Sequence, residues 1–156
     1  MKRFSSVFAC SLIVFLLHIP LLAGASQLLR GNSSYTSDVL YTFDGKYLYK
    51  GNSTYTSDIL YSWDGKYVFQ GKSQYSSDIL CSWDGKYVYQ GRSAYSSDII
   101  YTFDGQYLYL GRSSFMSDIV MTFSRGHIYS GCSTYTSDIL YTVKGHIPVP
   151  VLLMVI

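Results

Sequence analysis

Residues 51–67 read G-N-S-T-Y-T-S-D-I-L-Y-S-W-D-G-K-Y, and versions of this stretch recur along the chain every twenty residues. Each copy opens on a glycine and keeps a Ser-Asp pair, and no insertion breaks the register. The opening glycines are Gly31, Gly51, Gly71, Gly91, Gly111 and Gly131. A strict period of this length is typical of a repeat protein, in which each unit buries its apolar surface against its neighbours.

Each copy predicts a β-hairpin. Two short runs of β-branched and aromatic residues, 39–43 and 47–49 in the first copy, flank an Asp-Gly pair. Such a pair between two strand-forming runs favours a type I′ turn, which needs positive φ at both central residues. We therefore expect Phe43 to lie opposite Lys46. The predicted structural turn residues are Asp44, Gly45, Asp64, Gly65, Asp84, Gly85, Asp104 and Gly105.

Both faces of this predicted hairpin are largely apolar or aromatic. One face carries Val39, Tyr41, Phe43 and Leu48, and the other carries Leu40, Thr42, Tyr47 and Tyr49. A single hairpin is only marginally stable in water, so neighbouring hairpins must cover it on both sides. The sequence therefore predicts an all-β protein of tandem hairpin repeats, arranged as a symmetric ring or flower or as a stacked meander, with a β-solenoid as the alternative.

The segment that links successive hairpins follows the pattern G-x-S-x-Y-x-S-D. The glycine supplies a bend, and the Ser and Asp side chains are suited to capping backbone N–H groups. We expect the central aromatic residue of each link to pack into the seam between two units. These residues are Tyr35, Tyr55, Tyr75, Tyr95, Phe115 and Tyr135.

The two ends of the chain depart from the repeat. Residues 1–25 have the form of a secretory signal peptide, with a basic start, an apolar run and a small-x-small cleavage pattern; an uncleaved anchor is the alternative. We expect residues 26–30 to be a short linker, residues 31–150 to be six tandem repeats and residues 151–156 to be an apolar tail. The tail is expected to form a final strand or a plug, with membrane contact as the alternative. An exported protein of this kind is periplasmic, at the cell surface or secreted.

Composition limits the partners. Lys2 and Arg3 belong to the leader, so ten basic residues remain and balance the ten Asp. No basic face emerges, and nucleic acid is therefore a poor candidate partner. A near-zero net charge together with 17 Tyr favours self-association. Cys81 and Cys132 occupy different places in their units, so we expect free thiols and no repeating disulfide framework.

The repeat motif, together with an apolar ending of the P-V-P type, resembles exported bacterial repeat proteins of the four-fold β-flower type. The resemblance covers about residues 31–156. It implies a symmetric arrangement of hairpins and a family without an assigned activity. The chain departs from that type in having six units, of which four keep Asp-Gly. A looser likeness to choline-binding and glucan-binding hairpin repeats lacks their W-Y-Y signature, so no ligand residues are carried over from them.

Catalysis needs unlike groups at one place, whereas repetition produces like places, so we expect no enzyme, no cofactor and no metal site. The repeated aromatic residues are the candidate binding row: Tyr47, Trp63, Tyr67, Trp83, Tyr87 and Tyr107. Exposed aromatic rings stack on sugars, while buried ones form a core. The sequence thus favours an exported, non-catalytic structural or interaction scaffold of unknown partner, with a carbohydrate- or cell-envelope-binding module as the alternative.

Overall fold

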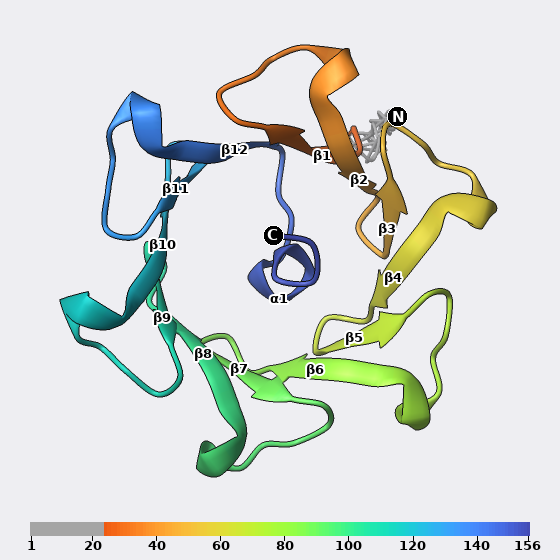
Figure 1. Ribbon diagram of the computed structural model, residues 1–156. Coiled ribbons are helices and arrows are strands. Elements are labelled where there is room, and N and C mark those ends of the chain that lie inside the picture. The colour runs from red at the N-terminus through yellow and green to blue at the C-terminus, as the bar shows by residue number, and fades with distance from the viewer. Residues whose placement is uncertain (1–23) are drawn as a thin grey trace, which may run out of the picture.

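The computed structural model describes residues 24–156, which form a closed ring of antiparallel strands around a central C-terminal segment (Figure 1). The strands are β1 (Ser26–Arg30), β2 (Val39–Phe43), β3 (Tyr47–Lys50), β4 (Ile59–Trp63), β5 (Tyr67–Gln70), β6 (Ile79–Trp83), β7 (Tyr87–Gln90), β8 (Ile99–Phe103), β9 (Tyr107–Leu110), β10 (Ile119–Ser124), β11 (His127–Ser130) and β12 (Ile139–Lys144). The expected all-β ring of hairpin repeats is confirmed. The expected leader lies outside the described residues except for its last two positions.

A single turn of 3-10 helix precedes each even-numbered strand. These turns are η1 (Thr36–Asp38), η2 (Thr56–Asp58), η3 (Ser76–Asp78), η4 (Ser96–Asp98), η5 (Met116–Asp118) and η6 (Thr136–Asp138). One short helix, α1 (Val149–Leu152), lies in the middle of the ring. In the part of the chain that the structure describes, no helix has the length and apolar character needed to cross a membrane.

The ring is closed by its first and last strands. Strand β1 pairs with β12 on one side and with β2 on the other, so residues 26–30, expected to be a linker, form half of the sixth hairpin unit. Leu29 lies opposite Thr142, the place that Tyr49 takes opposite Thr42 in the first hairpin. The expected second half of the sixth repeat leaves the wall instead. Pro148 and Pro150 have no N–H to donate to a ladder, and this explains the departure.

The hairpin turns differ from the predicted type. Asp44 N donates to Tyr47 O at 3.2 Å, so the two central turn residues are Gly45 and Lys46, and Phe43 lies opposite Leu48. Only Gly45 has positive φ, at 102°, which is the pattern of a II′ turn with glycine in the first central position. The predicted type I′ turn centred on Asp-Gly is therefore wrong by one residue. The only turn with two positive φ values at its centre within residues 24–156 is Arg125-Gly126, at 51° and 77°.

A β-bulge at the start of each even-numbered strand changes the predicted faces. The register passes from Leu28 opposite Tyr41 to Leu29 opposite Val39, and Leu40 is skipped. Val39 therefore shares the outer face with Thr42, and its predicted place beside Tyr41 is wrong. A bulge adds one residue to one strand, so every side chain before it changes face.

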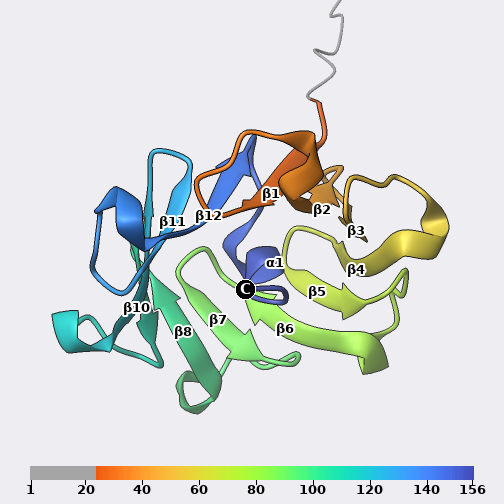
Figure 2. The same ribbon diagram turned by 45° about the horizontal axis from the view of Figure 1, so that its top comes forward.

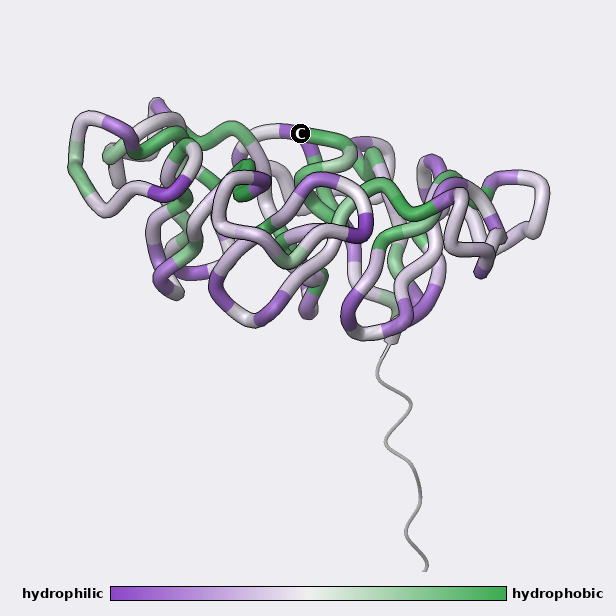
Figure 3. Tube along the Cα trace, turned by 90° about the horizontal axis from the view of Figure 1, so that it is seen from below, coloured by the Kyte–Doolittle hydropathy of each residue, from purple (hydrophilic) through white to green (hydrophobic). Residues whose placement is uncertain are grey.

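The inner face of the ring forms the core. Large apolar pairs face inward on all six units: Phe43–Leu48, Trp63–Val68, Trp83–Val88, Phe103–Leu108, Phe123–Ile128 and Val143–Leu28. The C-terminal segment fills the space between them, with Ile147, Val151 and Leu152 buried in the same cluster (Figure 2). Figure 3 shows apolar stretches along the wall and the tail, and hydrophilic positions in the loops. The tail is thus a plug, one of its two expected structural roles.

Candidate functional site

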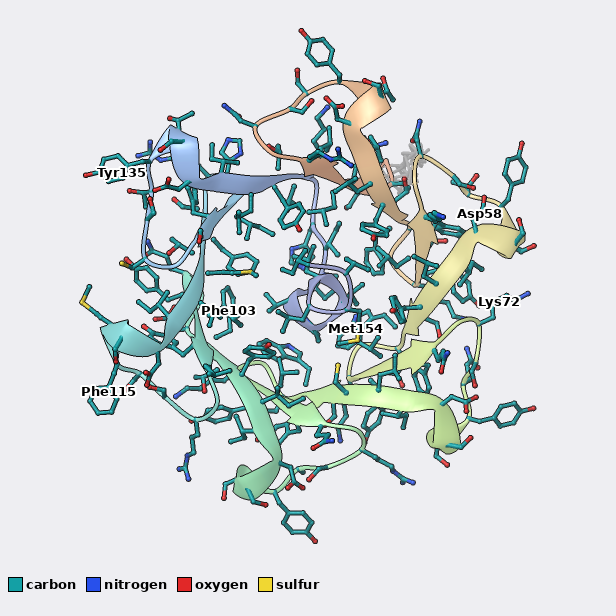
Figure 4. All side chains as sticks on the ribbon, in the orientation of Figure 1. Asp58, Lys72, Phe103, Phe115, Tyr135 and Met154 are labelled. Carbon is teal, nitrogen blue, oxygen red and sulfur yellow. The ribbon has the colours of Figure 1, made fainter. Side chains whose placement is uncertain are left out.

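Six aromatic side chains stand out into solvent around the perimeter of the ring, one from each link between hairpins. Each residue is 72% to 77% exposed. Figure 4 shows Phe115 and Tyr135 pointing away from the ring at the tips of their loops. The expectation that these rings pack into the seams is therefore wrong. We call this set the aromatic rim: Tyr35, Tyr55, Tyr75, Tyr95, Phe115 and Tyr135.

The Ser-Asp pattern of each link holds its rim residue outward. In the second link Ser53 Oγ donates to Asp58 Oδ2, and Tyr55 N donates to Ser53 Oγ at 3.1 Å. Asp58 N donates to Tyr55 O at 3.0 Å, which closes the 3-10 turn. The serine and aspartate thus occupy the inside of the loop, and the aromatic side chain has only solvent to enter. The same serine-aspartate bond recurs in all six links.

Each rim loop is also fixed to the barrel wall. Thr42 Oγ1 donates to Gly51 O at 2.8 Å, and Ser62 Oγ donates to Ser73 O at 2.8 Å. Both hydroxyl side chains are buried on the outer face of their strands. A buried hydroxyl that bonds to loop backbone restricts the loop and satisfies a carbonyl that would otherwise need water. The rim aromatics are therefore presented on anchored loops, and an anchored loop loses less entropy on binding than a free one.

The expected binding row does not form one surface. Trp63 and Trp83 lie on the inner face and pack against the core around the plug. The other four members, Tyr47, Tyr67, Tyr87 and Tyr107, are half-buried on the outer face. Each of these tyrosines lies edge-on to the ring two residues further along its strand, with centroids 6.2 to 6.4 Å apart. The structure therefore splits the row into two sets on opposite faces of the wall.

The predicted turn aspartates organise the hairpins. Asp44 Oδ1 accepts hydrogen bonds from Lys46 N at 2.8 Å and Tyr47 N at 2.7 Å, and Asp44 Oδ2 accepts one from Tyr49 Oη at 2.7 Å. Burial opposes ionisation of Asp44, but these hydrogen bonds prevail and hold its pKa below the ordinary value. Burial and the same bond to Asp44 raise the pKa of Tyr49 to about 12. The Asp44 carboxylate therefore remains ionised near neutral pH and holds the turn.

A pocket of about 270 Å³ lies in the seam between two adjacent units. Lys86 and Tyr87 enter it from the β6–β7 hairpin, while Asp104 and Tyr109 enter it from the β8–β9 hairpin. Arg112 and the two serines after it complete the wall from the rim loop. Two cations, one carboxylate and several hydroxyl groups therefore surround a half-buried aromatic ring. Nothing in the motif pattern marks this seam, because its residues come from two successive repeats.

A second pocket, of about 330 Å³, lies between the plug and the inner wall. Phe103, Phe123 and Leu152 contribute apolar surface, and Arg125 and His146 are exposed polar residues of its lining. His127 contributes to the lining too, but its ring nitrogen Nδ1 lies 3.1 Å from Thr142 Oγ1. Among residues 24–156 no group of three or more His, Cys, Asp or Glu side chains could hold a metal ion.

These features define a class: a closed ring of hairpin repeats that presents one equivalent loop per unit at its perimeter. Residues 28–152 match the family model described as 6-fold beta flower protein, and the chain belongs to that family. The β-flower resemblance is thereby confirmed, but the symmetry is six-fold rather than four-fold, because the sixth unit is completed by β1. No curated protein matched the chain. No solved structure matched it either.

Proposed function

We propose that the protein is an exported, non-catalytic interaction scaffold that binds an extended partner at several points through its aromatic rim. The observation that carries the proposal is the exposure of one aromatic residue per unit, at 72% to 77%, on six equivalent loops. Tyrosine side chains on a rigid support supply a large contact area at a low cost in conformational entropy. Several weak contacts held on one body give a strong combined affinity when the partner spans them.

Export is part of the proposal and rests on the amino-terminal sequence. The small-x-small pattern Ala23-Gly24-Ala25 directly precedes Ser26, the first residue of β1. Cleavage after Ala25 would leave the whole ring intact, because no described strand begins before Ser26. A scaffold outside the cytoplasm would meet the polymers of the cell envelope.

A carbohydrate- or envelope-binding module is the second candidate, and the rim favours it through the faces of its rings. Tyrosine faces stack on the apolar faces of sugars, and a row of them follows a polysaccharide chain. The residues proposed for this role are those of the rim, in place of the row that the motif suggested. Trp63 and Trp83 pack against the core and would not report this binding by fluorescence.

The test uses residues 26–156 and three rim substitutions made together, Tyr55→Ala, Tyr75→Ala and Tyr95→Ala. Binding to immobilised envelope fractions is measured by surface plasmon resonance. The affinity should fall at least about tenfold, since truncation of exposed aromatic anchors costs 1 kcal/mol or more each at binding surfaces. The matched control changes the neighbouring exposed positions, Thr56→Ala, Ser76→Ala and Ser96→Ala. Equal binding by both triple variants and the unchanged protein would exclude the rim as the binding surface.

A further inference from the structure

The seam pocket contains two cations with no carboxylate partner. Lys86 Nζ lies over the ring of Tyr87, 5.1 Å from its centroid, and Arg112 faces the same pocket from the rim loop. No salt bridge is formed within residues 24–156. Both cationic side chains are exposed and keep most of their hydrogen-bond donors free. The pocket therefore offers strong donors to a negatively charged group.

The one carboxylate in the pocket is already bonded to neutral donors. Asp104 Oδ1 accepts from Gln106 N and Tyr107 N, each within 2.9 Å, and Asp104 Oδ2 accepts from Tyr109 Oη at 2.9 Å. A carboxylate has about four lone-pair sites, so one acceptor site remains on Oδ2. A ligand that fills this pocket needs an acidic group for the two cations and a hydroxyl group for that remaining site.

The register repeats this arrangement in two neighbouring seams. Residues twenty and forty positions earlier place Lys66 with Arg92 and Lys46 with Lys72. The cation over the tyrosine ring is present in both, at 5.0 Å from the centroid. The cation pairs thus occupy three consecutive seams, along the arc that runs from β3 to β9 in Figure 1.

The two cation positions hold no cation in the remaining seams, where they are Ser26 with Asn52, Gln106 with Cys132, and Gly126 with Asn32. Gln27 Nε2 donates to Asn52 Oδ1 at 2.9 Å, so two neutral amides meet across one seam. In the last seam Lys144 Nζ donates to Ser34 O at 2.7 Å. Pairs of cations are therefore confined to three consecutive seams of the ring, while the rim aromatics continue all the way around.

We propose that this arc binds an acidic polysaccharide, with its acid groups in the seams and its sugar rings on the rim aromatics of the same loops. The loop that carries Arg112 also carries Phe115, so one loop serves both contacts. A hydroxyl group beside the acid donates to Asp104, which a simple anion cannot do. A polymer with regularly spaced acid groups occupies adjacent seams together and gains affinity from each. This inference rests on the proposed function, because it names the ligand class of the rim.

Two pairs of probes test the ligand class. Polygalacturonate is compared with its methyl-esterified form, and dextran sulfate is compared with dextran, by isothermal titration calorimetry with residues 26–156. Each charged polymer should bind more tightly than its neutral counterpart, and the binding should weaken as salt is raised, because exposed charges are screened. The pair that shows the larger difference identifies the acid as a carboxylate or a sulfate.

Variants locate the binding. K86Q/R112Q should weaken binding of the charged polymer at least about tenfold, since it removes two charge-assisted contacts. The control R30Q/K50Q removes the same net charge outside the pocket and should have less than about a twofold effect. Equal binding by both double variants, equal binding of charged and neutral polymers, or no binding of either charged polymer would overturn the inference. Loss of envelope binding in the rim variants would still support the proposed function in each of those cases.

Discussion

Replacement of Leu28 by Ala tests whether β1 closes the ring. Leu28 is fully buried, lies opposite Tyr41 on β2 and Val143 on β12, and belongs to the core cluster around the plug. Removing three carbon atoms from such a site leaves a cavity between two strands that are joined only through β1. Leu→Ala substitutions at buried sites cost about 2–5 kcal/mol.

We expect L28A to lower the free energy of unfolding by about 3 kcal/mol, a large part of the roughly 5–15 kcal/mol available to a domain. The melting temperature should fall by roughly 10 °C. The change is measured by urea unfolding, monitored by far-ultraviolet circular dichroism and by Trp fluorescence. If the two probes give coincident transitions, both data sets are fitted with one common slope m.

The matched control is Leu110→Ala. Leu110 is 59% exposed, so the same chemical change should cost less than about 0.5 kcal/mol. If L28A and L110A unfold at the same urea concentration, residues 26–30 are not part of the folded ring. The description of β1 as the closing strand would then be wrong.

Three further outcomes follow from the geometry. A maleimide should label Cys132, which is exposed, and leave Cys81 unlabelled until unfolding, because burial raises the pKa of Cys81 to about 12. Y89F should lower stability by about 1 kcal/mol at pH 7, because Asp84 Oδ2 loses its 2.7 Å bond from Tyr89 Oη. The cost stays this small because the carboxylate is exposed and water replaces the lost donor. Burial acts to raise the pKa of Asp84, but the hydrogen bonds that it accepts prevail and lower its pKa. The stability that this bond contributes is therefore present above the unfolded pKa of about 4 and is lost as the pH falls through the folded value. In urea titrations, the difference in unfolding free energy between Y89F and the parent should therefore be smaller at pH 3 than at pH 7. R125N should stabilise the protein by up to about 1 kcal/mol in the same assay, since Arg125 has a φ of 51° and Asn tolerates the left-handed region better; a variant less stable than the parent would contradict this reasoning.

The repeat predicted the hairpins but not the centre of their turns. Asp44-Gly45 satisfies the sequence pattern of a type I′ turn, but the backbone bond from Asp44 N to Tyr47 O shows that the aspartate precedes the turn, and its side chain accepts bonds from Lys46 N and Tyr47 N. Moving the centre by one residue changes the opposing residue by two, so Phe43 still shares a face with Leu48. The predicted faces hold for the ends of the strands near the turn for this reason. They fail at Val39, where a bulge that no motif announces reverses the alternation.

The proposed binding surface was the part least accessible to sequence reasoning. The recurring spacing of aromatic residues among small ones along the chain is equally consistent with a buried seam and with an exposed rim. The deciding factor is the serine two residues earlier, which occupies the loop interior through its bond to Asp58 in the second link. Likewise the seam pocket joins Lys86 to Arg112 across 26 positions, which is longer than one repeat and is set by the bulged register of β7 and β8.

The plug and the closing strand are two consequences of one constraint. A barrel of about eight strands is filled by its own side chains, whereas a wider one needs further material inside. This ring has twelve strands, so its inner wall alone leaves a space that Ile147, Val151 and Leu152 fill. The residues that would complete the sixth hairpin are therefore needed in the centre, and β1 supplies the missing strand from the other end of the chain. Six-fold repetition builds the wall, and the departure from repetition at both ends makes that wall a closed and filled domain.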